Sequence, residues 1–195
     1  MRPQELLSIL SVAEKLKCAT RHCDTSTGRR ESVAEHSWRL TLMAMLLEDE
    51  FPHTDISKVI KMCLIHDLGE AFTGDIATFN KSEADTAAEE TAYENWVNTF
   101  PDVQKEQFSH LLQEMSEMQT AEAKLYKALD KLEAVIQHNE SDISSWLPLE
   151  YDLQLTYGAD EVAFSFYLTS LKACIDSWTK SKIESDTQNA SGRLK

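Results

Sequence analysis

The chain has 195 residues, of which 42% are hydrophobic and 27% charged, and its formal net charge is −14 at pH 7. This length suits one domain with a sizeable core, and the negative charge argues against nucleic-acid polymers, whose phosphates would be repelled. Five Gly and four Pro leave little provision for the turns of an all-β fold. Because apolar residues recur at spacings of three and four, we expect an all-α domain.

The composition also predicts the organisation of the chain. We expect one domain over residues 1–180, followed by a polar tail over 181–195 whose composition is typical of disorder. The four cysteines contain no CxxC pair, which indicates neither a disulfide framework nor a zinc knuckle. There is no signal-peptide pattern, and no window approaches the ~18 apolar residues of a membrane span. These features predict a cytoplasmic protein without a membrane partner.

The predicted helices follow in chain order. Apolar spacing predicts a first helix over residues 3–17, and a polar segment follows from Arg21 to Glu31. The capping box Ser32-Val-Ala-Glu35 starts a second helix with His36 in its first turn, and a third is expected from about Asp55 to Leu68. Further helices are expected over 82–98, 102–116, Thr120 to about His138, and 160–180, with an irregular segment over 141–159.

Four residues on these helices form the order H…HD…D: His36, His66, Asp67 and Asp130. Neutral imidazoles and carboxylates make a mixed nitrogen and oxygen set, which suits a divalent first-row metal. Such a metal can lower the pKa of bound water to near neutrality. Asp130 lies beside an apolar stripe, where a carboxylate needs either a metal or a basic partner. The pattern predicts metal-assisted hydrolysis.

Two further acidic residues, Glu70 and Asp75, follow the His66-Asp67 dyad. We expect Gly69 and Gly74 to open the backbone there, which would leave both carboxylates at the mouth of the site. Taken alone, each could be a solvated helix-end or turn residue. Beside a ligand dyad, we interpret them as functional.

The stretch 15–30 is basic although the chain as a whole is acidic. A solvated loop would explain it, and so would a phosphate clamp that brings a small anion to the metal. Arginine suits phosphate because its planar fork can bind two oxygens. The basic residues are Lys15, Lys17, Arg21, Arg29 and Arg30.

Several stretches within 16–140 carry a family pattern: Leu16-Lys-Cys-Ala-Thr-Arg21, Arg30-Glu-Ser-Val-Ala-Glu-His36-Ser, His66-Asp67-Leu-Gly-Glu70 with Thr73-Gly-Asp75, and Ala121-Glu-Ala-Lys-Leu-Tyr-Lys-Ala-Leu-Asp130-Lys. Together and in this order, they resemble the HD-domain superfamily of metal-dependent phosphohydrolases. The resemblance is strongest to its branch of small 5'-deoxynucleotidases. It implies an all-α fold, a homodimer, and release of phosphate from deoxyribonucleoside 5'-monophosphates.

The resemblance implies that one divalent metal ion is held by His36, His66, Asp67 and Asp130. Branches with two metals need further histidine ligands before the last aspartate, and between the dyad and Asp130 this chain has only His110. Mn, Co, Mg, Fe and Zn all accept such ligands, so the sequence does not identify the metal.

The resemblance also implies roles around the metal. Glu70 and Asp75 match catalytic carboxylates, with Asp75 also orienting the substrate, and Arg21 matches a phosphate-contacting arginine. His22 stands where bacterial members often have a tryptophan that helps to reject a ribose 2'-hydroxyl. The choice between deoxyribose and ribose is therefore open for this chain.

Several alternatives share the same metal pattern. The substrate could be a cyclic nucleotide or the stringent-response nucleotide, although branches for the latter have an acidic pair after the dyad and here Glu70 is followed by Ala71. A nucleotide-binding sensor would keep the phosphate clamp without catalysis. A structural metal site would have a closed coordination shell and no use for Glu70 and Asp75.

Overall fold

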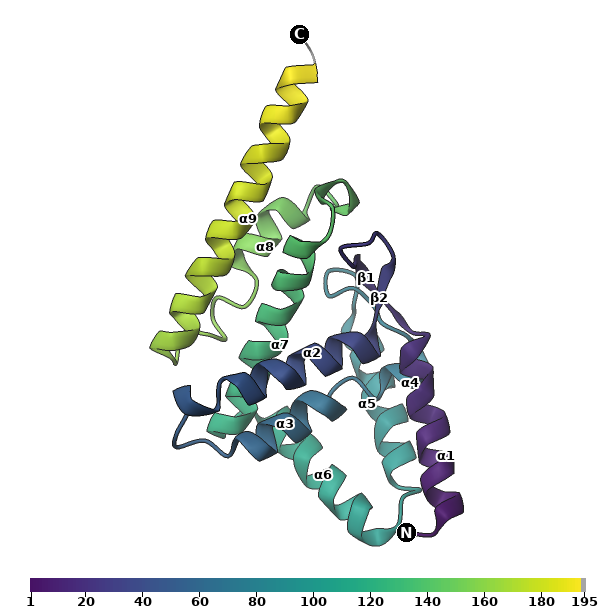
Figure 1. Cartoon of the computed structure of the whole chain (residues 1–195). Helices are drawn as coiled ribbons and strands as arrows, with labels where there is room; N and C mark the ends of the chain where they lie inside the picture. The colour runs from purple at the N-terminus through teal and green to yellow at the C-terminus, as the bar shows by residue number, and fades with distance from the viewer. Residues whose placement is uncertain (194–195) are drawn as a thin grey trace. The chain divides into compact units, whose positions relative to one another are not determined.

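The computed structural model describes residues 1–193 and is predominantly helical (Figure 1). This confirms the expected helical class and adds a small two-stranded sheet, β1 (Thr20–Asp24) and β2 (Arg30–Ser32). The α-helices are α1 (Pro3–Ala13), α2 (Val33–Leu46), α3 (Ile56–Ile65), α4 (Glu70–Thr73), α5 (Glu83–Val97), α6 (Asp102–Glu117), α7 (Ala121–Glu140), α8 (Glu150–Thr156) and α9 (Phe166–Arg193). Short 3-10 turns are η1 (Glu14–Lys17), η2 (Glu48–Glu50) and η3 (Ile143–Ser145).

The described chain divides into two compact units. The first contains Met1–His22 and Glu31–Tyr126, and the second contains Cys23–Arg30 and the chain from Lys127 onward. The single domain expected over residues 1–180 stays a prediction. Among the described residues, no helix is long and apolar enough to cross a membrane.

The first unit is built around α2, α3 and α5. Helix α2 packs against α3, and α5 contacts both α4 and α6. Two clusters of buried side chains form part of its core: Tyr93, Trp96, Val97 and Phe100 in one, and Leu16, Val33 and Ala71 in the other. Leu68 packs against both clusters, so the segment between α3 and α4 is anchored on two sides.

Two helices of this unit begin at serine caps, as their sequences dictate. The Oγ atom of Ser32 accepts from the Glu35 N–H, while the Glu35 carboxylate accepts from the Ser32 N–H (2.9 Å). This confirms the predicted start of α2. Ser82 and Asp85 make the same reciprocal pair at the start of α5. Both boxes satisfy backbone donors that a helix start leaves free.

The third helix is shorter than expected, because α3 ends at Ile65 and not at Leu68. Residues 66–69 form turns before α4 begins at Glu70. The Ile65 carbonyl oxygen accepts from the buried Tyr93 hydroxyl over 2.8 Å and from the Leu68 N–H over 3.2 Å. This tertiary hydrogen bond was not visible in local spacing.

The polar segment from Arg21 to Glu31 contains a hairpin that the sequence analysis missed. At its tip, Thr25 N–H donates to the Arg29 carbonyl oxygen over 2.7 Å, and Gly28 adopts a φ of 79°. Strands of five and three residues are too short to display a clear alternating pattern, so the segment looked like a loop.

The second unit departs from the sequence expectation at two places. Helix α8 lies inside 141–159, which was expected to be irregular, and α9 continues to Arg193, where a disordered tail was expected from Ser181. The continued helix has tertiary partners: Lys182 donates to the carbonyl oxygens of Asn139 (3.1 Å) and Ser141, and the Tyr151 hydroxyl contacts Asp186 (3.3 Å). Composition indicates disorder only where such partners are missing.

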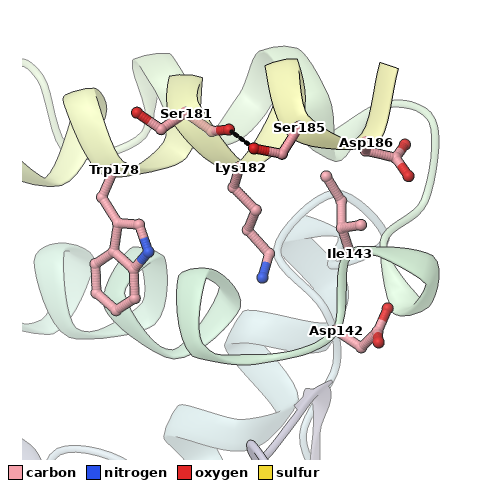
Figure 2. A pocket seen from close by; sticks show the side chains of 7 residues that line it. All are labelled: Asp142, Ile143, Trp178, Ser181, Lys182, Ser185 and Asp186. Carbon is pink, nitrogen blue, oxygen red and sulfur yellow. Dashed lines mark hydrogen bonds between the residues drawn. The ribbon is translucent and has the colours of Figure 1, made fainter. Parts of the chain in front are cut away.

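A pocket of about 420 Å³ lies along α9 in this second unit (Figure 2). Figure 2 shows the Trp178 and Lys182 side chains extending from α9, with Asp142 and Ile143 in the segment at the start of η3. Its lining residues are Asp142, Ile143, Trp178, Ser181, Lys182, Ser185 and Asp186. None of the predicted site residues lines it.

Candidate functional site

Three of the predicted metal ligands converge in the first unit. His36 is fully buried in the first turn of α2, His66 caps the end of α3, and Asp67 follows it in the turn. The two Nε2 atoms lie 3.3 Å apart, and Oδ2 of Asp67 is 3.0 Å from Nε2 of His66 and 3.8 Å from that of His36. Two elements distant in sequence thus present three donor atoms to one point.

These donor atoms fit a first-row metal. Ligands bound at about 2.1 Å lie roughly 3.0 Å apart in an octahedral shell and roughly 3.4 Å apart in a tetrahedral one. The separations of 3.0 and 3.3 Å fall within this range, and the third, 3.8 Å between His36 and Asp67, is wider. Nδ1 of His66 lies 2.9 Å from the carbonyl oxygen of Cys63, which can only accept. Nδ1 therefore carries the proton, which leaves the Nε2 lone pair for a metal.

The core holds the dyad in place. Leu68 is sandwiched between the two hydrophobic clusters, directly after Asp67. Gly69 then allows α5 to approach, because a Cβ atom built there would lie only 2.9 Å from Cγ of Glu89 and 3.4 Å from Cβ of Tyr93. The glycine of the HDLGE stretch is therefore required by packing and not by an unusual backbone angle.

Glu70 is buried behind the dyad, with 5% of its surface exposed. Burial raises its pKa to about 9, and the nearby carboxylates of Asp67, Asp75 and Glu89 add to the rise, while Arg21 opposes it. Within residues 1–193, its Oε2 atom is buried and has no hydrogen-bond partner. A perturbed, partly unsatisfied carboxyl beside metal-type ligands is a common feature of catalytic sites.

Asp75 follows Gly74, which ends α4 with a φ of 76°. Burial raises the pKa of its carboxyl, and Asp67 adds to the rise, while Arg21, Lys81 and His36 lower it. Asp75 therefore shares its electrostatic environment with the dyad and with Glu70.

Arg21 lies on β1 and reaches the same cluster. Its Nε is 3.2 Å from Oε2 of Glu31, and its Nη1 is 3.8 Å from Oδ2 of Asp67. The side chain is only 14% exposed. The structure thus brings this predicted phosphate contact within ion-pair distance of a predicted metal ligand.

His22, the neighbour of Arg21, packs against a residue that the sequence analysis did not single out. Its ring meets the Phe79 ring edge to face, with centroids 5.3 Å apart. Phe79 belongs to the loop between α4 and α5 that also carries Asp75. Only the tertiary structure pairs these two rings.

Asp130 lies on the part of α7 that belongs to the second unit. Its Oδ2 accepts from Nζ of Lys127, one turn earlier on α7, over 2.8 Å. This is the basic partner that the sequence analysis offered as an alternative to a metal. Its role as a ligand stays a prediction.

Lys81 was also missed. It lies in the loop before α5, and its Nζ donates to Oε2 of Glu89 over 2.6 Å. Burial alone would lower the pKa of Lys81, but the hydrogen bond to Glu89 and the charges of Glu70 and Asp67 outweigh it and raise the pKa. A lone lysine in a polar loop gives no sequence signal for this position.

A helical fold that brings a histidine on one helix close to a His-Asp dyad at the end of a second helix defines a class of metal-binding domain. Over residues 13–167, the sequence matches the family described as HD domain. The chain therefore belongs to the HD domain family.

Similar proteins give this class more detail. The chain is 37% identical over 109 residues to a protein of Xenopus laevis and 32% identical over 114 residues to one of Homo sapiens, both named 5'-deoxynucleotidase HDDC2. These alignments cover 55% and 57% of this chain. They span 53% and 55% of the relatives, so the chain matches about half the length of each.

A solved structure covers more of the chain. It is described as a predicted metal-dependent phosphohydrolase from Magnetospirillum magnetotacticum MS-1. The TM-score is 0.75 at 26% sequence identity, with 93% of this chain and 96% of that chain covered. The likeness therefore extends well beyond the region of the curated alignments.

Proposed function

We propose that this protein is a metal-dependent phosphohydrolase that releases phosphate from nucleoside 5'-monophosphates, as a 5'-deoxynucleotidase. The observation that carries the proposal is the convergence of His36, His66 and Asp67 beside the buried carboxyl of Glu70. The relatives named 5'-deoxynucleotidase supply the substrate class.

One divalent ion would be held by His36, His66 and Asp67, with Asp130 as the fourth ligand. When bound, it would polarise a phosphate oxygen and lower the pKa of a coordinated water. Mn, Co, Mg, Fe and Zn all remain candidates, because each accepts imidazole and carboxylate ligands. For Asp130 the support is the order of the family motif, and the Lys127 contact would have to yield to the metal.

Glu70 and Asp75 are proposed to handle protons and to orient the attacking water. Burial raises the pKa of Glu70 to about 9 in the metal-free protein, and a bound divalent cation would lower it towards the range in which a carboxyl exchanges a proton with the water or with the leaving 5'-oxygen. Asp75 is proposed to orient the substrate as well, since its carboxyl lies in the field of both Arg21 and His36.

Arg21 is proposed to stabilise charge on the phosphoryl oxygens. A guanidinium held close to Asp67 can meet a phosphate bound beside that carboxylate. His22, with Phe79 packed against it, is proposed to border the sugar. We retain a homodimer and a cytoplasmic location as expectations from the family pattern and the four free cysteines.

The test is phosphate release by metal-stripped protein that is re-supplied in turn with Mn, Co, Mg, Fe and Zn. The substrates are all deoxyribo- and ribonucleoside 5'-monophosphates, and a His66→Ala variant is the control. We expect metal-dependent release that the variant loses. Release from the deoxyribonucleotides alone would support sugar selection by the His22 region. Release from deoxyribo- and ribonucleotides alike would show that the protein does not select the sugar.

No release with any metal would contradict the proposed function. Cyclic nucleotides and the stringent-response nucleotide would then be assayed as the other phosphoester substrates. Binding of nucleoside monophosphates without turnover would indicate a sensor.

A further inference from the structure

The loop between α4 and α5 carries a cation that the catalytic scheme above does not use. Lys81 is the residue before the Ser82 cap of α5, and its side chain is 24% exposed. Its ammonium donates to Oε2 of Glu89, two turns into α5, over 2.6 Å. The loop end is thus fastened to the helix by a short ion pair.

This ion pair lies against the turn that holds the dyad. Glu89 occupies the space over Gly69, where a Cβ atom would lie 2.9 Å from its Cγ and 3.4 Å from its backbone oxygen. Gly69 separates the Asp67-Leu68 step from Glu70. Through Glu89, the Lys81 ammonium is therefore connected to the turn that carries Asp67 and Glu70.

The electrostatics agree with this placement. The carboxylates of Glu70 and Asp67 help to raise the pKa of Lys81, and Lys81 in turn lowers the pKa of Asp75. All three carboxyls belong to the proposed catalytic cluster. The ammonium is therefore near enough to feel the charges that a bound phosphate would meet.

Lys81 also has hydrogen-bonding capacity left. An ammonium has three donors, and among the described residues the only side-chain hydrogen bond of Lys81 is the one to Glu89. Arg21, by contrast, is already within ion-pair distance of Glu31 and Asp67. Of these two cations, Lys81 is the one less neutralised by its neighbours.

We propose that Lys81 is a second phosphate-binding residue of this site, held in position by Glu89 and able to donate to the phosphoryl oxygens of the substrate. The inference rests on the proposed function in one respect, that the ligand carries a phosphate monoester. A lysine serves this purpose as a point charge beside the planar fork of Arg21.

The test compares Lys81→Gln with Glu89→Gln in the metal-loaded full chain. Both changes break the ion pair, but only the first removes the cation, and glutamine preserves the Glu89 packing on Gly69. Calorimetric titration would measure the Kd of inorganic phosphate, of a deoxynucleoside monophosphate and of the parent deoxynucleoside. A Lys81→Arg variant tests whether charge alone restores binding.

We expect Lys81→Gln to weaken binding of phosphate and of the monophosphate by about 10- to 100-fold, the usual effect of one charge-assisted hydrogen bond. Binding of the deoxynucleoside should not change, Glu89→Gln should bind phosphate at least as tightly as the wild type, and Lys81→Arg should recover most of the loss. Where the monophosphate is turned over, its KM should rise more than kcat falls.

Equal weakening by Lys81→Gln and Glu89→Gln would overturn the proposal, because it would mean that the pair only fastens the loop. A change of less than twofold in Lys81→Gln would also overturn it. Should Lys81→Gln fail to fold, Lys81→Arg and Glu89→Gln still decide, since loss of phosphate binding in both indicates a fastening role. Phosphate binding that depends on Lys81 in a protein without turnover would contradict the proposed function but support the role of Lys81. Absence of phosphate binding by the wild type would overturn the role of Lys81.

Discussion

The buried carboxyl of Glu70 should make the metal-free protein less stable as the pH rises. Its pKa in the folded protein is about 9, against an ordinary value of 4.5. Between these values the folded state holds a proton that the unfolded state releases. The stabilising effect of this proton is complete below pH 4.5 and is lost as the pH rises towards 9, at about 1.36 kcal/mol per pH unit.

The substitution Glu70→Gln isolates this effect, because glutamine has nearly the same shape and does not ionise. At pH 7.5, about three units above the ordinary value, the full shift would correspond to an upper bound of about 4 kcal/mol. The metal-free variant should therefore be more stable than the wild type at pH 7.5, by up to this amount. Near pH 5 the difference should shrink below about 1 kcal/mol.

The assay is urea denaturation of both proteins in the presence of a chelator, at pH 5 and at pH 7.5. Comparing the two proteins at each pH cancels the titration of groups that do not interact with Glu70, whereas the response of Asp67, Asp75 and Glu89 to its charge is part of the measured effect. A stability difference that is the same at both pH values, or a variant that is less stable at pH 7.5, would refute the electrostatic reasoning.

Three further predictions concern the same segment. Glu70→Ala should lower turnover at least ~100-fold, as expected for loss of a proton-transfer group, while metal analysis finds the ion retained; near-normal turnover would remove Glu70 from the mechanism. His66→Ala should weaken metal affinity by more than ~100-fold, because mutating even a residue that only hydrogen-bonds to a ligand typically weakens metal affinity about 10- to 100-fold. Undiminished metal content after dialysis would contradict the ligand assignment. Gly69→Ala should lower the free energy of unfolding by about 1–3 kcal/mol, because its Cβ would lie 2.9 Å from Cγ of Glu89. A urea midpoint equal to that of the wild type would show that Glu89 and α5 can move aside without loss of stability.

Local sequence determined the features that depend on neighbours along the chain. In each capping box the serine and its acidic partner are three residues apart. The starts of α2 and α5 therefore follow from hydrogen bonds within one helical turn. The helical spacing of apolar residues specified the helical class for a similar reason. The His66-Asp67 dyad and its distant partner His36 stood out in the sequence because imidazoles and carboxylates in this order suit a divalent first-row metal.

The tertiary structure decided what depends on contacts between distant residues. At the end of α3, the Ile65 carbonyl oxygen accepts a hydrogen bond from Tyr93, 28 residues later, and beyond Ser181 helix α9 is contacted by Asn139 and Tyr151. The Lys81–Glu89 pair and the His22–Phe79 contact likewise depend on how a loop returns to the dyad. No local pattern specifies such contacts, because their free energy comes from burial and charge pairing that exist only once the chain has folded.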